Sequence, residues 1–103
     1  MPDQIVRIWK GYGTEAGVNR YCHDHFPKAV LPHLRAIVGF LDARVLTRVG
    51  RGESEVVVAT VWESLEAVRA FAGTNYEDAV VEPVVRELLT RFDEHVTHFT
   101  VAS

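Results

Sequence analysis

The segment from Ser54 to Trp62 (SEVVVATVW) restricts the possible folds more than any other part of the sequence. Its β-branched residues predict a strand, and both of its alternating sets of side chains are apolar. A strand that is apolar on both faces needs apolar cover on both. We therefore expect it to lie inside a layered structure. The two sets are Val56, Val58 and Trp62, and Val57, Ala59 and Val61.

The rest of the chain has the patterns of three more strands and two helices. Turn residues at 50–52 (GRG) predict that the second and third strands form a hairpin. Thr14 and Ser64 are placed to cap the helices, and Pro27 and Pro32 are expected to kink or break the first helix. The predicted strands are Gln4–Tyr12, Gly39–Val49, Ser54–Trp62 and His95–Val101, and the predicted helices are 14–34 and Leu65–Ala72.

The apolar residues of the first helix recur at intervals of three and four, which predicts one stripe against the sheet. That stripe is Val18, Cys22, Phe26, Ala29 and Val30. After the second helix, Asn75 is expected to cap a further helical stretch that Pro83 divides. Its inward-facing residues are expected to be Val80, Val84, Leu88 and Leu89.

The resulting order of elements is βαββαβ, with an extra helical turn before the last strand. This order predicts the α+β class, with a ferredoxin-like antiparallel sheet and helices on one face, in a single domain covering residues 1–103. Val56, Val58 and their neighbours then require a second layer on the other face. A second copy of the sheet would supply it and would make a homodimeric barrel. The alternative is a monomer that exposes some valine side chains.

The composition argues against several classes of partner. The chain has 11 Lys and Arg against 14 Asp and Glu, a formal net charge of -3, and the basic residues are scattered. No nucleic-acid partner is expected from this pattern. Cys22 is the only cysteine, which excludes an internal disulfide and a cysteine-based zinc site. The sequence starts without a secretory signal and its longest apolar run, 56–62, is too short to span a membrane, so we expect a cytoplasmic protein without a membrane partner.

Four segments carry a further pattern: WESLEAVRAFAG (Trp62–Gly73), YEDAVVEP (76–83), GFLDARVLTR (39–48) and FDEHVTHFTV (92–101). Together they resemble the antibiotic biosynthesis monooxygenase family, and the likeness covers nearly the whole chain. The resemblance implies the dimeric α+β barrel of that family. Some members oxidise phenolic polyketides with O₂ and use neither metal nor flavin. Others open the haem ring, and many have no assigned activity.

The same resemblance argues against haem degradation. The haem-degrading members use an Asn on the first strand, a Trp late in the second helix and a His further along. The corresponding positions here are Val6 or Arg7, Phe71 and Val81, and all three depart from the pattern. Trp62 lies earlier, at the strand end, and does not correspond to that Trp. We therefore expect no haem, flavin or other cofactor.

His25 is the candidate catalytic residue. At helical spacing it shares a stripe with Val18 and Cys22 and points toward the sheet. A histidine, with an ordinary pKa of about 6.5, suits a general base at neutral pH. Such a base removes a proton from a phenol or anthrone, and the resulting carbanion can reduce O₂. The alternative is a structural histidine bonded to a backbone carbonyl or to Tyr21.

The other histidines do not predict a metal site. His23 lies on the opposite side of the helix from His25, and ligands on one helix need spacings of three or four. His95 and His98 fall on opposite faces of the last predicted strand. No metal is therefore expected.

Aromatic residues supply the candidate substrate-binding positions. They can line a slot beside His25, although aromatic residues near strand ends also serve as core. Arg44 and Arg48, on the barrel face, either bind an anionic ligand or pair with acidic groups such as Asp42 across the dimer. The candidate substrate-binding residues are Tyr21, Trp62, Phe71, Tyr76 and His98, with Trp9 as a further member of the slot.

Two functions remain open from the sequence. The first is a cofactor-independent monooxygenase that oxidises a small aromatic, phenol- or anthrone-like substrate with O₂. The second is a non-catalytic dimeric module that binds a small apolar metabolite or serves assembly. A cavity of roughly 300 Å³ or more lined by His25 favours the first, and a packed interior favours the second.

Overall fold

The computed structural model describes residues 3–103. Three long strands form most of one antiparallel sheet: β1 (Ile5–Gly13), β2 (Phe40–Val49) and β3 (Ser54–Trp62). Two short strands, β4 (Arg91–Phe92) and β5 (Thr97–Thr100), pair with β1, so that β1 and β3 are interior strands. The sheet order is β2-β3-β1-β4, with β5 also beside β1.

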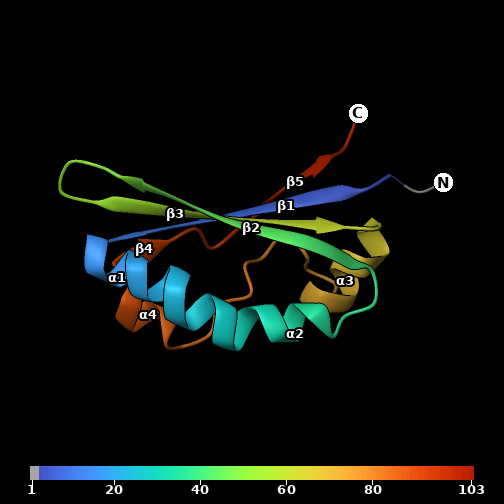
Figure 1. Cartoon of the computed structure of the whole chain (residues 1–103). Helices are drawn as coiled ribbons and strands as arrows, with labels where there is room; N and C mark the ends of the chain where they lie inside the picture. Colours follow the sequence, from blue (N-terminus) through green and yellow to red (C-terminus); the bar gives the residue numbers. More distant parts are fainter. Residues whose placement is uncertain (1–2) are drawn as a thin grey trace.

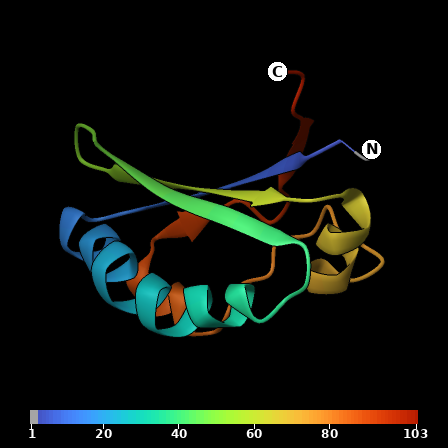
Figure 2. The same ribbon diagram turned by 45° about the vertical axis from the view of Figure 1, so that its right-hand side comes forward.

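The helices all cover the same face of this sheet (Figure 1). Figure 2 shows the same two layers after a turn of 45°. The fold is therefore α+β and ferredoxin-like, as the sequence predicts. None of the helices within residues 3–103 is long and apolar enough to cross a membrane. The helical segments are α1 (Glu15–Arg20), the π-helical segment η1 (Tyr21–Val30), α2 (Leu31–Arg35), α3 (Leu65–Ala72) and α4 (Val85–Leu88).

The first three helical segments follow one another without a break. Thr14 caps them as predicted, since its Oγ1 accepts a hydrogen bond from the amide of Gly17 at 3.0 Å. Pro27 does not break the helix, because residues 21–30 are wound as a π-helix. The amide of Leu31, for example, bonds to the carbonyl of Phe26, five residues back. A proline ring collides with the preceding turn of a regular α-helix, and the wider π turn leaves it more room.

The π winding also changes which side chains face the sheet. Tyr21 and Phe26, five residues apart, are both buried, whereas Ala29 is exposed and Cys22 is half-buried. The predicted stripe is therefore wrong at Ala29, whereas Cys22 and Val30 still pack against the core. It assumed 3.6 residues per turn, which does not hold in a π-helix.

The second helix matches its prediction from cap to stop. The Ser64 hydroxyl accepts a hydrogen bond from the amide of Ala67 at 3.3 Å, which starts α3. Gly73 ends the helix with φ at 85°, a conformation that glycine adopts at little cost. Local sequence signals are sufficient here because both helix ends depend on residues next to the helix.

The helix predicted from Asn75 is wrong, since only α4 is helical in this part of the chain. The backbone at 77–79 instead bonds to the segment before β5: Val96 donates to the Glu77 carbonyl and Ala79 donates to the Glu94 carbonyl. These partners replace the helical hydrogen bonds that the sequence pattern suggested. Of the four residues expected to face inward, Leu89 is buried and Leu88 is half-buried, but Val80 and Val84 are 47% and 39% exposed.

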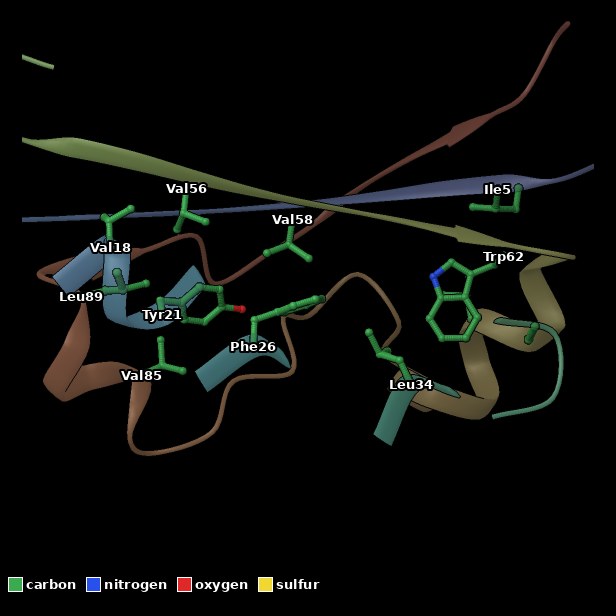
Figure 3. Close-up of a cluster of buried hydrophobic side chains, with 12 residues drawn as sticks. Ile5, Val18, Tyr21, Phe26, Leu34, Val56, Val58, Trp62, Val85 and Leu89 are labelled. Atoms are coloured by element: carbon green, nitrogen blue, oxygen red, sulfur yellow. The ribbon is translucent and has the colours of Figure 1, made fainter. Parts of the chain in front are cut away.

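The two faces of β3 have different cover. Val56, Val58 and Trp62 point toward the helices and join the main core (Figure 3). The expectation that Val56 and Val58 need a layer beyond the sheet is therefore wrong, because the helices cover them. Val57, Ala59 and Val61 lie on the opposite, open face and are half-buried.

The open face also carries apolar side chains from neighbouring strands. Leu46 of β2 pairs with Val57, and Phe99 of β5 pairs with Val6, which itself pairs with Val61. Leu46 is 54% exposed and Phe99 is 56% exposed. The need for a second layer thus applies to this set of residues.

Candidate functional site

A cavity of about 50 Å³ lies between the sheet and the helices. Segments distant in the sequence meet around it: Arg7 and Trp9 come from β1, Tyr21 from η1 and Phe71 from α3. Glu82 joins them from the irregular segment before α4. The volume suits a few water molecules and is below the roughly 300 Å³ of an open ligand pocket. A larger molecule therefore requires the wall to move.

Arg7 is the most unusual residue of the cavity wall. It is only 4% exposed, and its guanidinium lies over the ring of Phe71 at 5.5 Å from the centroid. The guanidinium donates hydrogen bonds to the backbone carbonyls of Tyr76 and Asp78, the latter at 2.9 Å. Burial lowers the pKa of Arg7 to about 10, so the group remains protonated at neutral pH.

His98 lies on the next strand and contacts the same guanidinium. Its Nε2 is 3.1 Å from Nη1 of Arg7, and its ring meets that of Tyr76 edge-on at 5.3 Å. Burial lowers the pKa of His98, and the charge of Arg7 lowers it further. His98 is therefore neutral at pH 7, and its Nε2 accepts the hydrogen bond from Arg7.

The predicted substrate-binding residues separate into three groups. Tyr21 and Phe71 line the cavity. Tyr76 and His98 line a second, more open hollow of about 400 Å³. Trp62 is 0% exposed in the core, where it stacks on Phe71 with ring centroids 5.4 Å apart and its Nε1 donates to Thr60 Oγ1 at 2.8 Å.

The predicted base, His25, lies beside the cavity and is absent from its lining. Its side chain is 10% exposed, and Nε2 lies 3.4 Å from Oε2 of Glu82, which does line the cavity. The His25 ring also packs against Tyr21, with centroids 5.5 Å apart. The geometry allows a proton to pass from a bound molecule to Glu82, with His25 as the group that holds the carboxylate.

Tyr21 contributes a hydroxyl group to the wall of the cavity. Burial raises the pKa of Tyr21, and the neighbouring Glu82 carboxylate raises it further. The phenol therefore stays protonated and can donate a hydrogen bond into the cavity.

Sequence reasoning missed Arg7 and Glu82 as site residues. Ile5 and Val6 precede Arg7 and Ile8 follows it, so the sequence leaves the inward face of β1 undecided. Glu82 follows two valines in a segment that was expected to be helical. For Arg7, the available signal was a lone basic residue among apolar strand neighbours.

Two further sequence hypotheses concern metal ions and surface arginines. Within residues 3–103, no three His, Cys, Asp or Glu side chains come together in a way that could hold a metal ion. Arg44 pairs with Asp42 at 3.5 Å, and Arg48 pairs with Glu55 at 2.9 Å. Both arginines are exposed on the open face of the sheet, and both of these pairs form within one chain.

Solved structures of other proteins have the same fold as this chain. No protein family profile matches the chain, and no curated protein matches its sequence. Solved structures do match. A protein from Bacillus cereus, provisionally assigned as an antibiotic biosynthesis monooxygenase, has a TM-score of 0.67 and 20% identity, over 98% of this chain and 95% of that chain.

Two other solved structures are similar to nearly the same extent. A heme-degrading protein from Mycobacterium tuberculosis has a TM-score of 0.64 and 22% identity, over 100% of this chain and 96% of that chain. A dimeric ferredoxin-like protein from an uncultured marine organism has a TM-score of 0.63 and 16% identity, over 98% of this chain and 97% of that chain. The chain is thus of the ferredoxin-like α+β class. It has the fold of a protein assigned to the antibiotic biosynthesis monooxygenases, in agreement with the resemblance found in the sequence.

Proposed function

We propose that the chain is a cofactor-independent monooxygenase that oxidises a small aromatic substrate with O₂. The observation that carries this proposal is the cavity between sheet and helices. Trp9, Tyr21 and Phe71 give it aromatic walls, and the Glu82–His25 pair stands at its edge. One fold hosts many functions, so the proposal depends on this site and takes only support from the similar structures.

In the proposed reaction, the aromatic walls hold the ring and the Glu82–His25 pair removes one proton from the substrate. The resulting carbanion transfers electrons to O₂, and a carbon–oxygen bond forms. For an anthrone, the CH₂ group becomes a carbonyl, and the second oxygen atom leaves as water with the two hydrogens. This balance needs no further reductant.

Substrate entry requires movement of the wall that contains Val80 to Glu82. Within residues 3–103, the amides of Val80, Val81 and Glu82 make no backbone hydrogen bond. Val80 is also 47% exposed. This segment is therefore the part of the wall that a ligand displaces at least cost.

The test is oxygen consumption with a panel of anthrones and quinols. We expect Glu82→Gln to lower the rate about 10²- to 10⁴-fold, because a positioned base is lost. His25→Ala should lower the rate less, because it removes only the group that holds the Glu82 carboxylate. His23→Ala is the matched control, since His23 lies on the same helical segment but is exposed. If the wild-type protein consumes no oxygen with any phenolic compound, the monooxygenase proposal fails.

The second candidate is a non-catalytic module that binds a small apolar molecule. The observation in its favour is the small volume of the cavity, about 50 Å³, which is below the roughly 300 Å³ of a ligand pocket, and the absence of His25 from its lining. It predicts that aromatic compounds raise the melting temperature while oxygen consumption stays at background. In that case, His25→Ala would lower stability by about 1–3 kcal/mol, because an imidazole that is 10% exposed and packs against Tyr21 would be lost.

We also propose that the chain forms a homodimer through the open face of its sheet. This face carries apolar side chains beside the ion pairs of Arg44 and Arg48, and a second copy would cover them on association. The apolar side chains are Val57, Ala59, Val61, Leu46 and Phe99. The dimeric ferredoxin-like neighbour supports this assembly. The cavity lies on the other side of the sheet, so each copy keeps its own site.

A further inference from the structure

The charge of Arg7 has no opposite charge beside it. Within residues 3–103, no carboxylate forms an ion pair with this guanidinium. Its protein partners are two backbone carbonyls and a neutral imidazole. These groups orient the guanidinium and do not neutralise it. A buried charge is costly unless it is paired, so an arginine that is 4% exposed with only neutral partners indicates a missing anion.

The nearby acidic side chains are already engaged or exposed. The Asp78 carboxylate is 3.1 Å from Nδ1 of His95, and Glu82 is 3.4 Å from His25. Glu77 is exposed to solvent. None of the three therefore serves as the counter-ion of Arg7.

Arg7 also retains donors that a ligand can use. A guanidinium has five N–H groups. Nη1 contacts Tyr76 and His98 and Nη2 contacts Asp78, so within the described residues the Nε–H and one N–H of Nη2 make no hydrogen bond. Two donors match the two oxygens of a carboxylate or the single oxygen of a phenolate.

We propose that Arg7 is the anion-binding residue of the cavity and that the ligand is a planar aromatic molecule with a negatively charged oxygen. This inference rests on the proposed use of the cavity as an aromatic site. Phe71 and Trp9 hold the ring, and Arg7 binds the carboxylate or phenolate oxygen. In the oxidation proposed above, the same contact stabilises the negative charge that forms when the substrate loses its proton.

The first experiment measures binding of 2-naphthoate and of its neutral analogue 2-naphthamide to the wild-type protein by calorimetry. We expect naphthoate to bind about 10- to 100-fold more tightly, because its carboxylate can pair with the charge of Arg7 and the amide of naphthamide cannot. In Arg7→Gln the preference should disappear. Arg35→Gln, which removes an exposed arginine, should keep it.

A second arm separates carboxylate from phenolate ligands and does not depend on the Gln variant being folded. Wild-type protein is mixed with 2-naphthol at pH 7, and the absorption band of the naphtholate is followed. Appearance of that band on binding favours a phenolate ligand, whereas naphthoate binding without it favours a carboxylate. Arg7→Lys keeps the charge and should retain part of the preference.

The outcomes distinguish the two proposals. Equal affinity of the wild-type protein for naphthoate and naphthamide overturns the role of Arg7 and leaves the aromatic cavity in place. Binding of none of the three compounds overturns the aromatic site and the inference with it. Retention of the naphthoate preference in a folded Arg7→Gln variant assigns the anion to another residue and refutes the inference.

Discussion

Arg7 joins three parts of the chain that are far apart in sequence. It lies on β1, bonds to carbonyls at 76 and 78, and contacts His98 on β5. Its position therefore depends on contacts over about the full length of the chain. Trp62, by contrast, is fully buried in the core.

Trp62→Ala should destabilise the protein by about 3–5 kcal/mol, because a fully buried indole is lost and a cavity remains. Trp62 is 0% exposed and packs against Phe40 and Phe71. The measurement is unfolding by denaturant, with Trp9→Ala as a comparison at a half-buried site. A loss under about 1 kcal/mol together with lost ligand binding would make Trp62 a substrate-binding residue after all.

The lowered pKa of His98 predicts that the protein loses stability when the pH falls. Burial and then Arg7 lower its pKa in the folded state, while Glu77 opposes this in part. The unfolded chain thus takes up the proton more readily than the folded chain does. This contribution to stability is complete above the unfolded pKa of about 6.5 and is lost as pH falls through the lower folded value.

The measurement compares melting temperatures at pH 7.5 and pH 5 for wild-type protein and His98→Gln. Gln keeps a hydrogen-bond acceptor for Arg7 but does not titrate. The wild-type protein should lose more stability than the variant over this range. Equal losses would show that the other histidines, which both proteins share, account for the acid response.

At the scale of elements, α1 and α4 approach each other closely at Gly17. A Cβ atom at this position would collide with the backbone carbonyl of Leu88. Replacing a glycine inside a helix by alanine usually raises the stability of the protein by about 0.5–1 kcal/mol. Here Gly17→Ala should instead destabilise by about 1–3 kcal/mol, because the backbone must shift.

Asn19→Ala is the matched control for this prediction. Asn19 is exposed on the same helix, so the change should be neutral or slightly stabilising through helix propensity. Thermal unfolding of both variants gives the comparison. A Gly17→Ala protein as stable as Asn19→Ala would mean that α1 and α4 can separate without cost.

Elements with local signals were predictable from the sequence, and elements with distant partners were not. The cap at Ser64, the stop at Gly73 and the hairpin of β2 and β3 follow from neighbouring residues. The segment 75–84 is not helical, because its carbonyls bond to Arg7 and to the amide of Val96. β4 was missed because it has only two residues, too few to show an alternating pattern.

The candidate site was less predictable than the fold for the same reason. Tyr21 and Phe71, two of the aromatic residues expected to line a slot, lie in the cavity wall, and their role in binding a substrate stays a prediction. The inward face of β1 follows from its register with β3, in which Arg7 pairs with Thr60. Because these strands have apolar residues on both faces, the sequence does not decide between this register and one shifted by a single residue, which would turn Arg7 to the other face.

At the scale of the whole molecule, the open sheet face predicts the state of association. The wild-type protein should be a dimer at micromolar concentration in sedimentation or light scattering. Leu46→Asp places a charge on this face and should shift the protein toward the monomer, because the carboxylate would be buried against apolar side chains. Leu46 is 54% exposed, so the fold of one chain should tolerate the change.

Val38→Asp is the control for this experiment. Val38 is 90% exposed but lies in the turn before β2, outside the sheet. The same charge there should leave the dimer intact. A wild-type protein that sediments as a monomer would refute the proposed barrel.

The first and last strands of the chain, β1 and β5, are antiparallel neighbours, so the chain starts and ends on the same side of the molecule (Figure 1, Figure 2). The amide of Val101 bonds to the carbonyl of Gln4 at 2.9 Å. The backbone is thus close to a closed ring, and a short linker can join its ends while the exposed tip of the β2–β3 hairpin at 50–52 is opened. Such a circular permutant would keep every strand pairing of the sheet and would make β3 the first strand of the chain and β2 the last.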